Sequence, residues 1–522
     1  MGQLIMKSVG SVIFVLLAVA ITGCGGSTPA PPPPSGNFSN ASLKGQYAYL
    51  MSGIAAETGA YIARIGSFTA DGAGNISAGL EDVLALSSGQ PASVVSFTGG
   101  TYAIQPNGRG VISLQAASGG LKLSVALQSA NSGFVVQTDL SAASSGSIHL
   151  QTPADFSLSA LNNQYVFELS GVTFLPNAAA PISLIGEFNA NGSGAVTGGV
   201  MDINNGNLAP SGATLIAPGS YAMDPSNGAA FGRGTMAFSG YAFAFYIIDS
   251  THIVILEEDA LGGSSGDALL QTGPVPTQNS QFTGSFVYLI GGAFVHGTQG
   301  PIARVARFSS DGNGGIGSLS VDDNYNGNYT HTSQASNTSY AIDTSNPGSG
   351  RGTFTFTSSG ITVNNVFYVI SSTQAVVQET TAGVIGGGPM NAQSPGPFAL
   401  SGLTGNFVFY WSGVQLGANT AIPLEEDFVG QYALANTSSG NIAGATDYFE
   451  LGLSGTSLFT DVPLAGTLTI NGDGTANNLY KFAVNGSPSA TVNFQAYFVN
   501  PSTAFLVTSD SNRTIAGIIS QQ

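Results

Sequence analysis

The chain has 522 residues, carries a formal net charge of −17 and contains one cysteine. The strongly negative charge excludes nucleic acid as a partner, because phosphate binding depends on Lys and Arg side chains. A single cysteine excludes an intrachain disulfide. Only 7% of the residues are charged and 72 are glycine, which favours β-structure with tight turns over helices, whose wet faces need charged side chains.

The first 24 residues have the parts of a secretory leader. Lys7 is its only charge, and the apolar stretch from Val12 to Ile21 is too short for a membrane-spanning helix. The leader ends in the sequence LAVAITGC, which closes on Cys24. This ending resembles the lipobox of bacterial lipoproteins, in which an apolar residue and two small residues precede the acylated cysteine. A plain signal peptide that is cut near Cys24 is the alternative.

The lipoprotein resemblance implies that residues 1–23 are a signal peptide and that Cys24 becomes the lipidated N-terminus. Gly25 follows it, whereas aspartate there usually signals retention in the inner membrane, so the resemblance implies an outer-membrane location in the cell envelope. Residues 24–40 contain the run PAPPPPSG, which favours an extended, semi-stiff tether. We therefore expect the lipid bilayer to be a partner through acylated Cys24.

The remaining chain is a fourfold repeat. Each copy opens with an apolar residue, an aromatic pair and a glycine at constant offsets, and closes with a glycine five residues before a glutamine. The opening sets are Leu43, Tyr47, Tyr49 and Gly53; Leu161, Tyr165, Phe167 and Gly171; Phe282, Phe286, Tyr288 and Gly292; and Leu403, Phe407, Phe409 and Gly413. The closing pairs are Gly146 and Gln151, Gly266 and Gln271, Gly388 and Gln393, and Gly517 and Gln522. Proline-bearing linkers between them predict four tandem domains, residues 41–152, 159–273, 280–394 and 401–522.

Within each copy, short alternating apolar runs are separated by turns such as Asp71-Gly72 and Asp311-Gly312. This pattern predicts an all-β fold with about eight antiparallel strands in each domain. Closure into an up-and-down barrel removes the exposed edges, and a two-sheet β-sandwich is the alternative. The segment LTGNF at residues 403–407 is similar to the opening of avidin-like barrels and, more loosely, of lipocalins, which implies a barrel. As a whole the chain resembles bacterial lipoproteins with tandem glycine-rich β-repeats.

The recurring aromatic and arginine residues are the candidate ligand-binding set. Its members are Tyr47, Tyr49, Arg109, Tyr165, Phe167, Arg233, Phe286, Tyr288, Arg351 and Trp411. Aromatic side chains inside a small barrel can line a pocket for a glycan or a small apolar molecule. The alternative is that they fill the barrel core, since an eight-stranded barrel is only just wide enough to be filled by side chains.

The arginine of Gly-Arg-Gly recurs at Arg109, Arg233 and Arg351, and the fourth copy departs from it with Gly472-Asp473-Gly474. An aspartate also recurs after the hairpin turn, as Asp82, Asp202, Asp322 and Asp447. We expect the arginine either to bind a carboxylate ligand or to pair with this aspartate across a hairpin. A calcium site at the aspartates is a further alternative, but the calcium-loop pattern is missing, so no metal or other cofactor is expected.

Two features that suggest catalysis lack the required spacing. The acidic runs at residues 257–259 and 425–427 occupy different points of the repeat, whereas a glycosidase needs two facing carboxylates. His149, His252, His296 and His331 occupy unrelated repeat positions, with no Ser-His-Asp or metal-ligand spacing.

The sequence therefore predicts a membrane-anchored, non-catalytic cell-envelope lipoprotein that acts as a surface interaction or structural repeat protein, with glycans or other surface proteins as partners. A glycan or small apolar ligand-binding module is the alternative, and a polysaccharide hydrolase is the third hypothesis.

Overall fold

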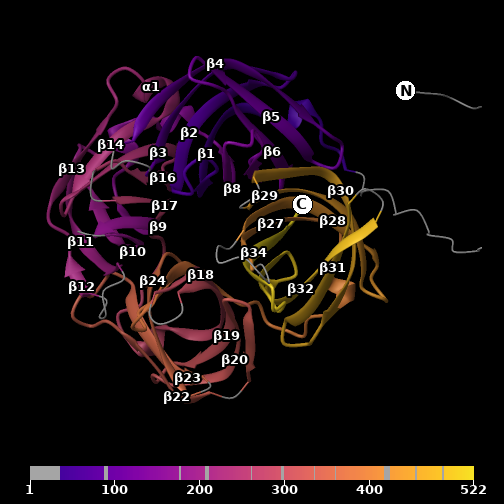
Figure 1. The fold of residues 1–522 in the computed structure, drawn as a ribbon. Coiled ribbons are helices and arrows are strands. Elements are labelled where there is room, and N and C mark those ends of the chain that lie inside the picture. Colours follow the sequence, from indigo (N-terminus) through magenta and orange to yellow (C-terminus); the bar gives the residue numbers. More distant parts are fainter. Residues whose placement is uncertain are drawn as a thin grey trace, which may run out of the picture.

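The computed structural model describes residues 36–86, 92–175, 178–205, 211–259, 262–295, 299–333, 335–358, 360–416, 424–452, 455–484 and 487–522. Cys24 and His296 lie outside these residues. The described chain is almost entirely β-structure, arranged as four antiparallel barrel-like sheets in sequence (Figure 1). Within this part of the chain, no helix is both long enough and apolar enough to span a membrane.

The first and fourth sheets are closed barrels of eight strands, in which each strand pairs with the next and the last pairs with the first. The first consists of β1 (Lys44–Ala55), β2 (Tyr61–Asp71), β3 (Asn75–Ala85), β4 (Ser93–Ile104), β5 (Arg109–Ala116), β6 (Leu121–Leu127), β7 (Ser132–Gln137) and β8 (Ala142–Leu150). The fourth consists of β27 (Asn406–Gln415), β28 (Leu424–Asn436), β29 (Asn441–Gly452), β30 (Gly455–Ile470), β31 (Thr475–Val484), β32 (Ser487–Asn500), β33 (Thr503–Thr508) and β34 (Arg513–Gln521).

The second and third sheets have nine strands each, in the order β10-β9-β17-β16-β15-β14-β13-β11-β12 and β21-β20-β19-β18-β26-β25-β24-β23-β22, and β10 also pairs with β11. The second consists of β9 (Gln164–Leu175), β10 (Ala178–Ala190), β11 (Ala195–Asn204), β12 (Ser211–Leu215), β13 (Gly219–Met223), β14 (Arg233–Phe238), β15 (Tyr241–Asp249), β16 (His252–Glu257) and β17 (Gly262–Leu270). The third consists of β18 (Thr283–Phe294), β19 (Gly300–Asp311), β20 (Ile316–Tyr325), β21 (Asn328–Thr332), β22 (Ser336–Ile342), β23 (Arg351–Ser358), β24 (Ile361–Val369), β25 (Gln374–Glu379) and β26 (Val384–Ala392). The prediction of four antiparallel β-domains with barrel topology is confirmed, and the chain does not adopt the β-sandwich.

Short helical turns precede the first strand of each barrel. The described helices are η1 (Asn40–Ser42), η2 (Pro153–Asp155), η3 (Leu158–Ala160), α1 (Gly228–Phe231), η4 (Asn279–Gln281) and η5 (Leu400–Gly402). The apolar residue that opens each repeat follows one of these turns and is buried in the barrel core, as Leu43 and Leu161 are. A recurring tyrosine holds the turn in place, since the Tyr221 hydroxyl donates to the Leu161 carbonyl at 2.6 Å.

The interiors of the barrels are filled with aromatic and aliphatic side chains. Because side chains alternate along a strand, Tyr47 and Tyr49 of β1 point inward while Ala48 points outward into a different cluster. Inside the first barrel, Tyr47 stacks on Phe68 with 5.9 Å between ring centroids. The outward face of the first strands is apolar as well, so each barrel needs a second partner surface.

The glycines that recur at the start and end of each repeat permit the first and last strands to approach closely. A Cβ atom on Gly53 of β1 would lie 1.9 Å from the Ala143 carbonyl oxygen, and one on Gly146 of β8 would lie 1.9 Å from the Leu50 carbonyl oxygen. Since such contacts are sterically impossible, this seam of the barrel requires residues without a side chain.

The four barrels form a closed ring, which Figure 1 shows from indigo through magenta and orange to yellow. The outward faces of the first strands of each barrel pack against late strands of the next barrel, in four apolar clusters that join the first barrel to the second, the second to the third, the third to the fourth and the fourth to the first. Repeated head-to-tail contacts either close into a ring or grow into a filament. Here the fourth contact closes the ring, because β27, β28 and β29 pack on β6, β7 and β8.

Candidate functional site

The recurring arginine and the recurring aspartate meet at the interfaces between barrels. Arg233 of the second barrel donates from Nε and Nη2 to the carboxylate of Asp82 in the first, at 2.8 and 2.6 Å. Arg351 of the third barrel makes the same two bonds to Asp202 of the second, at 2.7 and 2.8 Å. The expected chemistry of the pair is correct, but the expectation of a hairpin within one repeat is wrong: the partner belongs to the preceding barrel.

The same pair closes the ring. Arg109 of the first barrel donates from Nη2 to Asp447 of the fourth at 2.5 Å, and from Nη1 to Asp461 at 2.9 Å. The side chains of Arg109 and Asp447 are buried, whereas that of Asp461 is 66% exposed. A recurring feature of the sequence therefore contacts its neighbouring copy, and the last copy contacts the first.

A tyrosine completes the arrangement at two of these interfaces. Tyr246 donates to Asp82 Oδ2 at 2.8 Å and Tyr368 donates to Asp202 Oδ2 at 2.7 Å. Burial opposes the charge on Arg233, but its hydrogen bonds and attraction to Asp82 outweigh burial and raise the pKa of the guanidinium above its ordinary value. Two parallel N–H···O bonds to one carboxylate are the strongest form of this contact.

The glutamine that ends each repeat binds the next barrel at all four interfaces. Its Nε2 atom donates to two backbone carbonyl oxygens. One belongs to the residue two positions before the recurring arginine position, and the other belongs to the neighbouring strand. The pairs of acceptors are Phe231 and Ile247 for Gln151, Ser349 and Val369 for Gln271, Asp473 and Phe498 for Gln393, and Asn107 and Leu127 for Gln522. The last of these joins the fourth barrel to the first.

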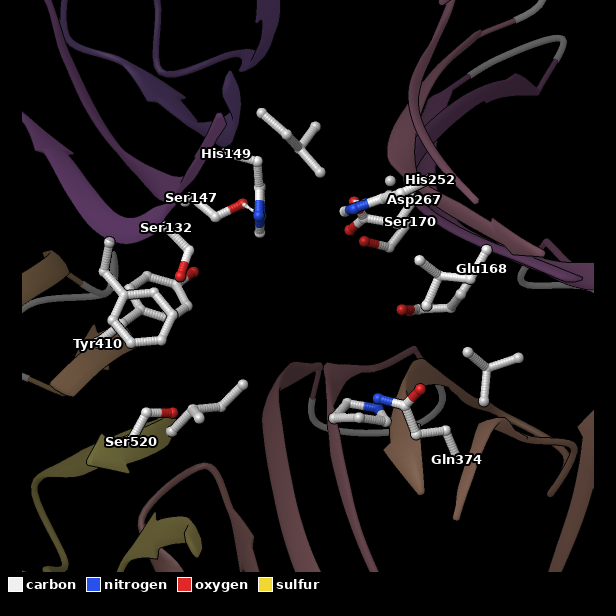
Figure 2. A pocket seen from close by; sticks show the side chains of 18 of the residues that line it. Ser132, Ser147, His149, Glu168, Ser170, His252, Asp267, Gln374, Tyr410 and Ser520 are labelled. Atoms are coloured by element: carbon white, nitrogen blue, oxygen red, sulfur yellow. Dashed lines mark hydrogen bonds and ion pairs between the residues drawn. The ribbon is translucent and has the colours of Figure 1, made fainter. Parts of the chain in front are cut away.

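A cavity of about 590 Å³ lies at the centre of the ring, and residues from all four barrels line it (Figure 2). The first and last strands of the barrels supply most of its wall. Phe134 and Tyr410 stack in the wall with 5.8 Å between centroids, and serine, glutamine and asparagine side chains also line the cavity. Within the described chain, the lining residues include no Lys or Arg. This volume is in the range of small-molecule sites, and the lining disfavours anionic ligands.

Two histidines face each other in the wall of the cavity, as Figure 2 shows. The rings of His149 and His252 meet edge to face at 5.0 Å, His149 Nε2 lies 3.2 Å from Ser147 Oγ, and His252 Nε2 lies 2.6 Å from Asp267 Oδ1. Burial, and then the neighbouring His252, lower the pKa of His149 to about 4. Sequence spacing missed this pair because the two histidines occupy different positions in different copies and meet only across a head-to-tail interface.

The acidic residues in the cavity lie on one wall. Glu168 of β9 is directly opposite Asp267 of β17 in the strand register. Burial, with a smaller contribution from Asp267, raises the pKa of Glu168 to about 7. A pair of carboxylates on adjacent strands does not flank a substrate from two sides, which is the arrangement that glycoside hydrolysis requires.

The acidic runs of the sequence have structural contacts. Glu426 pairs with Arg513 inside the fourth barrel, Asp427 accepts from Ser145 across the ring-closing interface, and Glu257 accepts from Ser264. Within the described residues, no group of three or more His, Cys, Asp or Glu side chains is placed to hold a metal ion.

The candidate ligand-binding residues lie away from the central cavity. The aromatic members Tyr47, Tyr49, Tyr165, Phe167, Phe286, Tyr288 and Trp411 are buried inside the barrels. The arginines Arg109, Arg233 and Arg351 lie at the interfaces. The ligand-binding role of these ten residues stays a prediction.

No protein-family model matches the chain, and no curated protein matches it in sequence. Among solved structures it is similar to a mutant of transferrin binding protein B from Haemophilus parasuis, with 10% identity, 75% of this chain and 83% of that chain covered, and a TM-score of 0.20. It is also similar to isotype 1 transferrin binding protein B from serogroup B Neisseria meningitidis, with 8% identity, 75% and 84% covered, and a TM-score of 0.21.

Proposed function

We propose that the protein is a non-catalytic lipoprotein of the cell envelope, anchored in the outer membrane through acylated Cys24, whose four barrels form one platform for interaction with other surface molecules. The observation that carries the proposal is the ring itself. Its closure uses the arginine, aspartate and glutamine residues that recur in the repeat. These recurring residues therefore hold the four barrels in one preassembled surface. Binding to such a surface avoids the entropic cost of ordering four separate domains.

The chemistry of the cavity supports a binding role over a catalytic one. A histidine whose pKa is about 4 is a weak base near neutral pH, so His149 is poorly suited to activate Ser147. The carboxylates of Glu168 and Asp267 share one wall.

The anchor is tested by fractionation of cells that express the full chain. Cys24→Ser should move the protein from the membrane to the soluble fraction and abolish incorporation of labelled palmitate. Gly25→Asp is the matched control, because it keeps the acylated cysteine and should move the protein from the outer to the inner membrane. Continued membrane association of the Cys24→Ser protein would contradict the lipid anchor.

The second candidate function is the binding of a neutral glycan or a small apolar molecule, and the central cavity is the observation that favours it. A cavity that presents both aromatic rings and serine and amide side chains suits sugars. The soluble Cys24→Ser protein should be screened against neutral cell-wall and plant glycans. Tyr410→Ala should weaken any such binding at least tenfold, while Leu215→Ala, at a position that is 73% exposed and does not line the cavity, should leave it unchanged. Equal binding by both variants would place the ligand elsewhere.

A further inference from the structure

One of the four interfaces lacks the arginine, and the strand register shows which residue replaces it. Arg233 and Arg351 are the register partners of Tyr246 and Tyr368. In the fourth barrel the partner of the equivalent tyrosine, Tyr497, is Thr475. The equivalent of Gly-Arg-Gly is therefore Gly474-Thr475-Ala476, and the sequence-based alignment on Gly472-Asp473-Gly474 is wrong by two residues.

The short threonine leaves a hollow of about 730 Å³ between the third and fourth barrels. Thr475 and Asn471 of the fourth barrel line it on one side, and Asp322 of the third barrel lines it on the other. Asp322 is the equivalent of Asp82 and Asp202, the two aspartates that hold a guanidinium at the preceding interfaces. The hollow thus occupies the place that an arginine side chain fills elsewhere in the ring.

The aspartate in the hollow keeps the burial and the tyrosine contact of its counterparts, but Tyr329 and His331 bind the oxygen that faces an arginine elsewhere. Its side chain is 3% exposed, and Tyr497 donates to Oδ2 at 2.5 Å, as Tyr246 and Tyr368 do for theirs. Its other oxygen accepts from Tyr329 and lies 2.8 Å from His331 Nδ1. His331 is 48% exposed, so it can turn into solvent when a stronger donor arrives.

The charges around the hollow leave one carboxylate, that of Asp322, without a cation of its own in the lining, because Arg307 offsets Asp473. Asp473, which is 45% exposed, adds a second carboxylate from the fourth barrel. Arg307 is the only arginine that lines the hollow within the described chain, and it already donates to Gln393 at 2.7 Å and lies 3.9 Å from Asp473. Asn471 occupies the position of Asp343, since each donates its backbone N–H to the carbonyl of the residue at the arginine position. Asp343 accepts from Nη1 of Arg351, and the amide oxygen of Asn471 can accept from a guanidinium as well.

We propose that this hollow is a binding site for a guanidinium group supplied by another molecule, either a free arginine-like compound or an arginine side chain of a partner protein. The guanidinium takes the position of the missing arginine, donates to Asp322 and Asn471, and displaces His331. A planar guanidinium fits the carboxylate with two parallel bonds, whereas an ammonium group makes a single-point contact. The site does not depend on the lipid anchor or on the central cavity.

Calorimetric titration of the soluble Cys24→Ser protein tests the site with three probes: free L-arginine, a short capped peptide whose only charged side chain is one arginine, and the same peptide carrying lysine instead. We expect one equivalent of an arginine probe to bind, with the lysine peptide at least tenfold weaker. If free L-arginine and the arginine peptide bind equally well, the peptide backbone adds nothing and the ligand is a small molecule. If the arginine peptide binds tenfold more tightly, the ligand is a protein segment. No binding of either arginine probe at millimolar concentration would overturn the proposal.

Variants locate the binding. Asp322→Asn should weaken it at least tenfold, and His331→Ala should strengthen it, because a competing donor is removed. Thr475→Arg should abolish binding and raise the melting temperature, since it supplies the guanidinium within the chain as Arg233 and Arg351 do. Asp461→Asn changes an exposed aspartate at another interface and is the matched control. Should Thr475→Arg fail to fold, the opposite effects of Asp322→Asn and His331→Ala still decide, and unchanged affinity in both would overturn the proposal.

Discussion

The ring-closing interface offers the sharpest test of the architecture, because no peptide linker joins the fourth barrel directly to the first. In Asp447→Asn, the buried guanidinium of Arg109 loses its buried carboxylate partner. Removal of one member of a buried ion pair costs about 3–5 kcal/mol. We expect the lower end, about 3 kcal/mol, because the bond from Arg109 to Asp461 at 2.9 Å remains. The apolar cluster around Val408 stays intact, so the ring should open more often without dissociating at equilibrium.

Opening can be measured as the rate at which a thiol reagent labels a cysteine introduced at Val408 in the Cys24→Ser protein. Val408 is fully buried against the first barrel, so labelling requires opening. A change of about 3 kcal/mol corresponds to labelling about 100-fold faster in Asp447→Asn. A cysteine at Ile519, inside the fourth barrel, should label at an unchanged rate, which separates ring opening from unfolding.

The matched control for this experiment is Asp461→Asn. Its side chain is 66% exposed, and exposed ion pairs contribute about 0–1 kcal/mol, so labelling should accelerate less than about fivefold. If Asp447→Asn and Asp461→Asn accelerated labelling equally, or if neither did, the buried pair would not hold the ring closed.

Three further predictions concern the stability of the barrels and of the contacts between them. Gln271→Ala leaves two carbonyl oxygens of the third barrel without their donor, so the free energy of unfolding in urea should fall by about 1–3 kcal/mol. Gly146→Ala places a Cβ atom 1.9 Å from the Leu50 carbonyl oxygen and should destabilise the first barrel by about 1–3 kcal/mol, seen as faster hydrogen exchange in β1 and β8. Burial raises the pKa of Glu168 and Glu187 to about 7; a carboxyl pKa raised on folding gives stability that is present below about pH 4.5 and is lost as the pH rises through 7. The melting temperature should therefore fall between pH 5 and pH 8, and Glu168→Gln should reduce that slope; an unchanged slope would refute this account of Glu168.

The sequence predicts the barrels well, because their determinants are local. The alternation of Tyr47, Ala48 and Tyr49 specifies a strand with one face inward, and the turn glycines specify hairpins. The aromatic pairs lie in the cores, as the alternative to the ligand-binding hypothesis expects. Repetition also identified the arginine, the aspartate and the glutamine as a recurring set.

The ring could not be predicted in the same way. In a repeat, a contact within one copy and a contact between neighbouring copies leave the same pattern, because the first three copies each carry both partners. The pairing of Arg233 with Asp82 rather than with Asp202 depends on which faces of two barrels meet. The central cavity and the meeting of His149 with His252 follow from the same assembly. The replacement of arginine by Thr475 needed the strand register, since nearby glycines allow more than one alignment.

The position of the missing arginine is consistent with the connectivity of the ring. The third and fourth barrels are joined by the short segment between β26 and β27, so loss of an ion pair there cannot let them diffuse apart, and the local concentration of one surface beside the other stays high. The fourth and first barrels have no such link, and opening their interface frees the two ends of the chain from each other. That interface keeps Arg109, adds Asp461 as a second acceptor and uses Gln522 at the end of the sequence. An interface held by a linker can give up its arginine and leave a binding site, whereas the closing interface keeps both the buried ion pair and the glutamine contact.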